Sequence, residues 1–236
     1  MLEVLYQDAH LIAINKPHGL LVHRSPIATN TDTYAVQELR NQINQHVYPV
    51  HRLDRKTSGV LLFALEKELI PALMKQFEEH EVKKTYWAIL RGYADDSGTI
   101  DYPLTNDKGK TQEAVTHYKT LERTEVPVPF GKHSSSRYSL VEAKPETGRM
   151  HQLRKHFAHI LHPIIGDRPH GCNKQNKLFL ERWNLSTMLL HASRLEIIHP
   201  VQKTQIDIQA NLSNEFQRMI KELNFSRYKE SSSEYV

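Results

Sequence analysis

The alternation of apolar and polar residues predicts many short strands interrupted by a few helices. Apolar residues at every second position, or in short continuous runs, are typical of strands, whereas apolar residues three or four apart are typical of helices. We therefore expect strands at residues 4–6, 11–15, 20–23, 84–91, 114–122, 137–144, 189–198 and 205–208, and a strand–turn–strand unit at 49–65. We expect helices at residues 33–45, 69–77 and 147–161, and a last helix that Ser213 caps and that carries Phe216, Met219, Ile220 and Leu223.

Several details of these elements are specific expectations. Asp32 or Thr33 is expected to cap the first helix, and Pro71 fits only the first turn of the second. The core face of the third helix is expected to carry Leu153, Phe157, Ile160 and Leu161. We expect loops at residues 25–32, 126–136 and 173–177, and a disordered polar tail at residues 226–236.

The order of these elements indicates an α+β fold. Strands and helices are intermixed, and several strands are placed to pair antiparallel with their neighbours. Neither an internal repeat nor a linker divides residues 1–225, so we expect one domain.

Composition and charge narrow the class of protein. With 39% hydrophobic and 25% charged residues, the 236-residue chain has the composition of a soluble protein with a core. The net charge of +4 and the pI of about 9.0 suit a polyanionic partner, and a solvated surface explains them equally well. The single Cys172, the absence of a leader-like start and the absence of an apolar run of about 18 residues predict a cytoplasmic protein without a membrane span.

One carboxylate stands out among the charged residues. Asp54 lies in the stretch His51–Gly59 beside three cations, Arg52, Arg55 and Lys56, which favour its charged form. If residues 50–54 are extended, Arg52 and Asp54 lie on one face, and Thr57–Gly59 forms a tight turn. On local physics alone, a catalytic carboxylate and a surface salt-bridge cluster are equally good interpretations.

Five motifs in order resemble those of one enzyme family. The stretch HRLDRKTSG (51–59) resembles the signature of the RluA-type pseudouridine synthases, and TGRMHQLR (147–154) with HPIIGD (162–167) resembles a second block of that family. The stretches NKPHGLLVH (15–23), KTY (84–86) and LHA (190–192) resemble three others, so the likeness spans roughly residues 2–210. Two positions depart from the family pattern: Met150 stands where Thr is common, and His170 where Tyr is common.

The resemblance implies a fold and a set of site residues. It implies a single catalytic domain with a mixed, mainly antiparallel sheet, a central cleft and flanking helices, without the N-terminal S4 module that many relatives carry. It makes Asp54 the catalytic residue and Arg154 its charged partner, while Tyr86 stacks on the flipped base and assists proton removal. The alternative for Tyr86 is an ordinary half-buried strand tyrosine. The resemblance implies that Leu153 packs on the uracil, and the alternative is an ordinary helix-core leucine. The expected substrate-binding residues are Arg52, Leu153, His151 and Arg149.

The resemblance also implies the substrate and excludes a cofactor. Several stretches of the chain resemble members of the family that modify the uridine at position 65 of tRNA, so tRNA is the expected partner of a monomeric enzyme. Isomerising uridine involves no net redox change or group transfer, and we expect no metal, no nucleotide and no other cofactor. The same reaction on another tRNA or rRNA uridine, a non-catalytic RNA-binding module, and a metal-dependent hydrolase are the alternatives. Only the last would use a histidine cluster as ligands, from His151, His156, His159 and His162.

Overall fold

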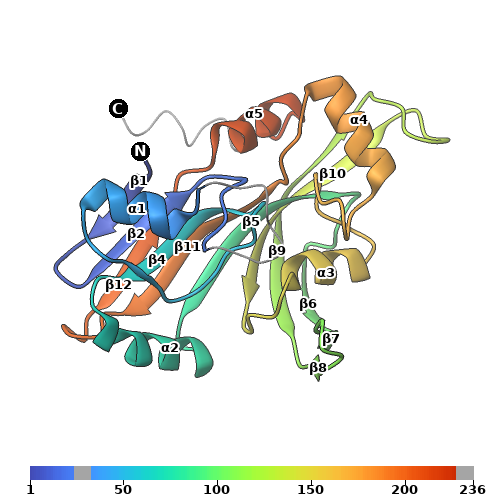
Figure 1. The fold of residues 1–236 in the computed structure, drawn as a ribbon. Coiled ribbons are helices and arrows are strands. Elements are labelled where there is room, and N and C mark those ends of the chain that lie inside the picture. The colour runs from blue at the N-terminus through green and yellow to red at the C-terminus, as the bar shows by residue number, and fades with distance from the viewer. Residues whose placement is uncertain (24–32, 227–236) are drawn as a thin grey trace. The chain divides into compact units, whose positions relative to one another are not determined.

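A computed structural model describes residues 1–23 and 33–226 of the chain, which form helices and strands in the order drawn in Figure 1. The strands are β1 (Glu3–Gln7), β2 (Leu11–Lys16), β3 (Tyr48–Pro49), β4 (Ser58–Ala64), β5 (Lys83–Arg91), β6 (Ser97–Asp101), β7 (Leu104–Thr105), β8 (Thr111–Gln112), β9 (Val115–Val126), β10 (Ser136–Pro145), β11 (Leu190–Ile198) and β12 (Gln205–Gln209). The helices are α1 (Ala35–Ile43), the 3-10 turn Lys67–Leu69, α2 (Ile70–Glu78), α3 (Gln152–His159), α4 (Asn173–Trp183) and α5 (Asn214–Glu222).

The chain divides into two compact units. The first contains residues Met1–Thr85 and His191–Leu212, and the second contains Tyr86–Leu190 and the chain from Ser213 onward. In the first unit β2 lies between β1 and β4, β3 also pairs with β4, and β12 pairs with β11, all antiparallel; β11 pairs with β4 in parallel. In the second unit β10 lies between β5 and β9, and β9 also pairs with β6, again antiparallel. The α+β class and the mainly antiparallel pairing are confirmed.

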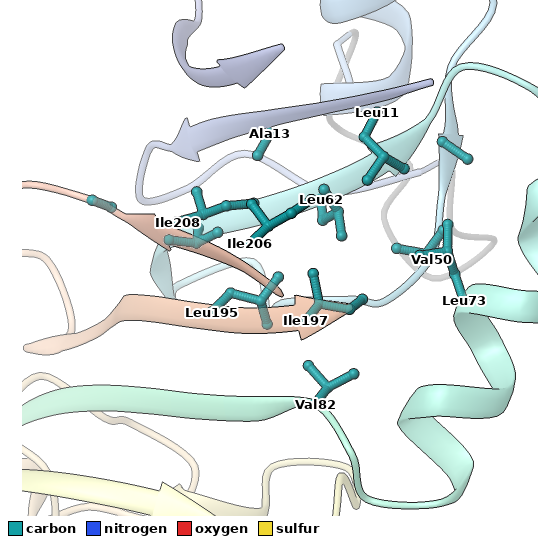
Figure 2. Packing of buried hydrophobic residues seen from close by; sticks show 13 residues of the cluster. Leu11, Ala13, Val50, Leu62, Leu73, Val82, Leu195, Ile197, Ile206 and Ile208 are labelled. Carbon is teal, nitrogen blue, oxygen red and sulfur yellow. The ribbon is translucent and has the colours of Figure 1, made fainter. Parts of the chain in front are cut away.

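The core of the first unit forms between its strands and α2. Strand alternation places Leu11 and Ala13 of β2 on the same face, where they meet Leu62 of β4 and Ile206 of β12. Figure 2 shows these side chains together with Leu73, which α2 contributes from the other side of the cluster. All seven residues of β4 are buried, so this strand is the centre of the unit.

The core of the second unit forms between α3 and the strands β5, β9 and β10. Phe157 of α3 is fully buried against Tyr118 of β9, and the edge of one ring faces the other at 5.7 Å between centroids. Val141 and Ala143 of β10 belong to the same cluster. This packing fixes α3 on the sheet by its apolar face and determines where its polar residues lie.

Most of the predicted elements are present with shifted ends. The strands predicted at residues 4–6, 11–15, 84–91, 114–122, 137–144, 189–198 and 205–208 are confirmed as β1, β2, β5, β9, β10, β11 and β12. Pro71 occupies the first turn of α2, as expected. Ser213 caps α5 by accepting a hydrogen bond from the backbone N–H of Phe216 at 3.3 Å.

Other predictions were wrong. Residues 20–23 form only an isolated bridge from Leu21 to Tyr34, and the N-cap of α1 is Tyr34 rather than Thr33. The predicted helix 147–161 begins at Gln152, because His151 adopts a left-handed conformation with φ 57°. It ends before Leu161, which has φ 64° and is 82% exposed instead of lying in the core.

The segment 173–177, expected to be a loop, is the start of α4. The segment is mostly polar, so its helical spacing was not recognised. The buried residues of α4 are Gln175 and Phe179, which lie one turn apart. Loop 25–32, the capping role of Asp32 and all but the first residue of the tail 226–236 lie outside the described residues. No helix within the described ranges is long and apolar enough to cross a membrane.

Gly59 allows β4 and β11 to approach each other. It has φ +109°, and a Cβ placed there would lie 2.1 Å from the backbone oxygen of Ala192.

We therefore predict that Gly59→Ala lowers the free energy of unfolding by roughly 4 kcal/mol or more. Gly19→Ala is the matched control in the same unit, because Gly19 has φ +89° but no atom within 4 Å of such a Cβ. It is expected to cost only about 1–2 kcal/mol. Urea unfolding measures both, and equal losses would contradict the role of the close approach.

Candidate active site

Asp54 lies in a turn between β3 and β4. The strand β3 ends at Pro49, so residues 50–54 are not the extended strand that the sequence suggested. The N–H of Thr57 closes the turn by donating to the carbonyl of Asp54 at 3.0 Å. The observed turn therefore begins at Asp54, whereas the predicted turn began at Thr57. Asp54 is half-buried and Arg52 is exposed. The turn therefore places the carboxylate at the protein surface on a backbone that is held at both ends by strands.

A buried lysine ties this turn to the loop after β2. The Lys16 side chain is 0% exposed, and its Nζ donates to the carbonyls of Pro17 and Leu20, each at 2.9 Å, and of Arg55 at 3.3 Å. The N–H of Gly19 donates to the same Arg55 carbonyl at 2.8 Å, and Nε of Arg55 donates to the carbonyl of Gly19 at 3.0 Å. Two motifs that are far apart in the sequence are thereby joined next to Asp54.

The charge of Lys16 is coupled to that of Asp54. Burial lowers the pKa of Lys16 to about 7, and the negative charge of Asp54 acts in the opposite direction by favouring the ammonium form. His18, two residues further along the chain, also has a lowered pKa. Burial, followed by the charges of Lys16, Lys56 and Arg55, lowers its pKa to about 4. Its Nε2 is buried without a hydrogen-bond partner among the described residues.

His51, the first residue of the motif, is an anchor. Its Nε2 accepts a hydrogen bond from the backbone N–H of Leu62 in β4 at 3.0 Å, and its ring stacks on Phe77 of α2 at 5.2 Å. Burial lowers the pKa of His51 to about 3, so the ring is neutral at pH 7 and can accept this hydrogen bond. The start of the Asp54 turn is fixed to the core of the unit by this side chain.

The other end of the turn is fixed by a serine–histidine pair. Ser58 Oγ lies 2.9 Å from Nδ1 of His191, and Nε2 of His191 lies 3.3 Å from the carbonyl of Ala210. Both side chains are buried, and burial lowers the pKa of His191 to about 4. The pair joins β4 to β11.

In the second unit, the start of α3 presents a buried arginine. Arg154 is 5% exposed, and its Nε and Nη2 donate to the two carboxylate oxygens of Asp167, each at 2.8 Å. This two-bond geometry is the strongest form of an arginine–carboxylate pair, and it fixes the plane of the guanidinium.

The residues just before α3 are held by its first residue. Gln152 Oε1 accepts hydrogen bonds from Thr147 Oγ1 at 2.7 Å and from the N–H of Arg149 at 3.0 Å. Arg149 Nε donates to the carbonyl of Glu113 at 2.9 Å, and Nδ1 of His151 lies 2.9 Å from Nε2 of His170. Arg149, His151 and Arg154, all predicted from the second motif block, are therefore grouped at one end of α3.

Tyr86 and Leu153 both belong to the core region of the second unit. Tyr86 lies on β5 opposite Ala143 of β10 and is half-buried. Leu153 is 6% exposed and belongs to the hydrophobic cluster against which Tyr86 packs. The core contacts of Leu153 are those of an ordinary helix residue. Of the predicted site residues, Asp54 and Arg52 belong to the first unit and the other five to the second.

The other three histidines named as possible ligands contact a hydroxyl, backbone carbonyls or an aromatic ring. His156 is buried between Thr116 and the carbonyl of Tyr102, His159 stacks on the Tyr102 ring at 3.7 Å, and His162 contacts the carbonyl of Arg91. Across the described part of the chain, no group of three or more His, Cys, Asp or Glu side chains is arranged to hold a metal ion.

Comparison with known proteins identifies the family. A sequence model described as RNA pseudouridylate synthase matches residues 10–159, which is more than half of the chain. The chain belongs to this family. A tRNA pseudouridine synthase C of Pectobacterium carotovorum subsp. carotovorum is 48% identical over 231 residues, 93% of this chain and 61% of that protein. A tRNA pseudouridine synthase C of Yersinia pestis is 45% identical over 96% of this chain and 92% of that protein.

A solved structure supports the same assignment. Human RNA Pseudouridylate Synthase Domain Containing 4 is 26% identical, with a TM-score of 0.71 over 94% of this chain and 93% of that chain. The fold is therefore that of a pseudouridylate synthase domain, and the chain is an isomerase. The predicted family resemblance is confirmed.

Two residues of this RNA pseudouridylate synthase were not assigned a site role from the sequence. Lys16 and Asp167 both lie inside motifs that the sequence displays, in NKPHG and in HPIIGD. What identifies them is burial: each is a charged residue that is at most 1% exposed. A lysine or aspartate is almost never fully buried unless it is paired, and neither partner can be read from the sequence.

Replacing Lys16 by Met tests the buried ammonium. The unfolded chain keeps the lysine proton up to about pH 10.5, whereas the folded chain releases it near pH 7. The unfolding free energy of the wild type should therefore rise relative to that of Lys16→Met between these values, by up to about 1.4 kcal/mol per pH unit. Urea unfolding from pH 7 to 9 measures this difference. Lys75→Met, at an exposed lysine of the same unit, is the control. A difference between wild type and Lys16→Met that is constant with pH would contradict the burial argument.

Proposed function

We propose that this enzyme converts a uridine of tRNA to pseudouridine and that Asp54 is the catalytic carboxylate. The observation that carries the proposal is the construction of the Asp54 turn, in which Lys16, Gly19 and Arg55 hold the backbone beside a half-buried carboxylate. The substrate class is supported by the relatives in Pectobacterium and Yersinia, which are both named tRNA pseudouridine synthase C.

The reaction needs an anchored carboxylate and little else. The bond between uracil N1 and the ribose C1′ breaks, the base turns, C5 bonds to the same C1′, and the C5 proton leaves while N1 gains one. Breaking the N1–C1′ bond develops positive character at C1′, which a fixed carboxylate can stabilise or attack. An adduct with Asp54 and elimination to a glycal are two routes that both use this carboxylate. The target base must first leave its stack, at a cost of roughly a few kcal/mol.

Residues of the second unit supply the remaining roles in this proposal. Arg154 is the proposed charged partner of Asp54, since a guanidinium held in one plane offers its donors in a fixed direction. Tyr86 stacks on the turned base and assists removal of the C5 proton, and Leu153 packs on the uracil. Tyr86 is half-buried on β5 and packs against the hydrophobic cluster of the second unit, which supports this role.

Arg52, Arg149 and His151 contact the RNA in this proposal. Arg52 is exposed beside Asp54 and is suited to fill the space left by the extruded base. The proposed target is the uridine at position 65, in the T stem, and the enzyme acts as a monomer without a cofactor. An rRNA uridine and a non-catalytic binding role are outcomes that the experiments distinguish.

Release of tritium from RNA labelled at uridine C5 tests the proposal. The native protein should release tritium from tRNA with chelator present, and Asp54→Asn should lower the rate on the order of 10³-fold or more. Release of tritium from rRNA but not from tRNA would show that the substrate is rRNA, while the proposed mechanism would stand. Equal rates for native protein and Asp54→Asn would contradict the catalytic role of Asp54, and tight RNA binding without release would support a binding module.

Arg52→Ala separates RNA binding from chemistry. Loss of one contact to the RNA should raise the Kd for tRNA about 3–10-fold, while the rate at saturating tRNA changes less than about twofold. Arg40→Ala, at an exposed arginine of α1, is the matched control and should leave both values unchanged. Filter binding and single-turnover rates give the two quantities. An Arg52→Ala variant with normal affinity and a slow saturated rate would be inconsistent with this role, as would an equal rate loss on a substrate whose uridine is already unstacked.

A further inference from the structure

One short segment of the second unit contacts two of the proposed site residues. Asp167, which is 1% exposed, accepts both hydrogen bonds from Arg154, and His170 lies 2.9 Å from His151. The rings of the two histidines are in edge-to-face contact at 5.1 Å between centroids. The N–H of His170 also points to Asp167 Oδ1 at 3.4 Å, so the two contacts belong to one turn.

The turn that carries Asp167 and His170 is itself braced. Asn176 of α4 accepts from the N–H of Gly166 at 2.9 Å and donates to the carbonyl of Asp167 at 2.7 Å. Gly166 has φ +83°, and a Cβ there would lie 2.0 Å from the backbone oxygen of Thr187. The backbone at Asp167 therefore has few alternative positions, which makes it a rigid base for the two contacts.

A stabilising role alone does not account for the buried pair. Taking a carboxylate and a guanidinium out of water is costly, and a hydrophobic pair of similar volume is often as stable. Asp167 binds the Nε and Nη2 edge of Arg154, which fixes the direction of the remaining donors. Burial lowers the pKa of His170, with the charge of Asp167 opposing it, so the ring is available as a neutral hydrogen-bond partner for His151.

We propose that Asp167 and His170 are positioning residues of the active site: Asp167 holds the guanidinium of Arg154, and His170 holds the ring of His151. The proposal rests on the proposed function, in which Arg154 and His151 meet the substrate. The two contacts differ in what they should affect. Misplacing Arg154 should slow the chemical step, whereas misplacing His151 should weaken RNA binding.

The Asp167 contact is tested with single-turnover kinetics on C5-labelled tRNA. Asp167→Asn keeps the shape of the side chain and removes its charge, and should lower the saturated rate on the order of 10–100-fold with the Kd for tRNA unchanged. The double variant with Arg154→Lys should be no slower than Arg154→Lys alone, because both changes break one unit. Asp207→Asn is the matched control, since Asp207 also binds an arginine, Arg194, through two hydrogen bonds, but at an exposed site of the first unit.

The His170 contact is tested with two variants. His170→Phe keeps the ring contact without the hydrogen bond and should raise the Kd for tRNA several-fold, while His170→Gln, which can still bond to His151, should restore binding. Rate losses for Asp167→Asn and Arg154→Lys that multiply, or equal affinities for His170→Phe and wild type, would overturn the proposal. If Asp167→Asn fails to fold, Asp167→Glu, which keeps the charge, must lower the saturated rate without changing the Kd. Native protein that releases no tritium from any RNA would overturn the proposed function and this inference together.

Discussion

The cost of burying charge determines how both motif-bearing regions are built. A buried ammonium or carboxylate is tolerated only when nearly all of its hydrogen-bonding capacity is satisfied. Lys16 meets this requirement with three backbone carbonyls, and Arg154 and Asp167 meet it with each other. Because these partners must stay in place for the charge to remain buried, each pair also fixes the loop that carries it.

The first unit shows how this constraint reaches Asp54. The Lys16 carbonyl partners include Arg55, the residue after Asp54, so the lysine holds the turn directly. Strand β4 then leads away from the turn into the centre of the sheet, where β11 lies so close to it that only a glycine fits at position 59. His51 and Ser58 fasten the two ends of the motif to these strands. The backbone that carries Asp54 is therefore held by contacts on both sides of the turn.

Much of the fold follows from local patterns, and the sequence therefore predicted it. The Ser213 cap, the position of Pro71 and the β9–β10 pair depend on residues near one another in the chain, where spacing is informative. The left-handed His151 and the helix at Asn173 were not predicted, since a positive φ at a non-glycine residue and a polar helix face leave little local trace. Tertiary contacts decide both.

The candidate site also contains residues that the sequence marks and residues that only tertiary contacts reveal. The family motifs marked Asp54 and Arg154 by position, but the partners Lys16 and Asp167 are recognised only through burial and contacts that join distant segments. Leu153 belongs to the hydrophobic cluster of the second unit, and its contact with uracil stays a prediction. His170, which departs from the family pattern, is explained by its contact with His151.

The most direct test of the account is to locate the product in tRNA. After incubation of unmodified tRNA with the native protein, each uridine is assayed for conversion by nucleoside analysis of defined fragments. The account predicts pseudouridine at position 65, with no change in RNA mass. No pseudouridine in tRNA or rRNA, despite RNA binding by the folded protein, would contradict it.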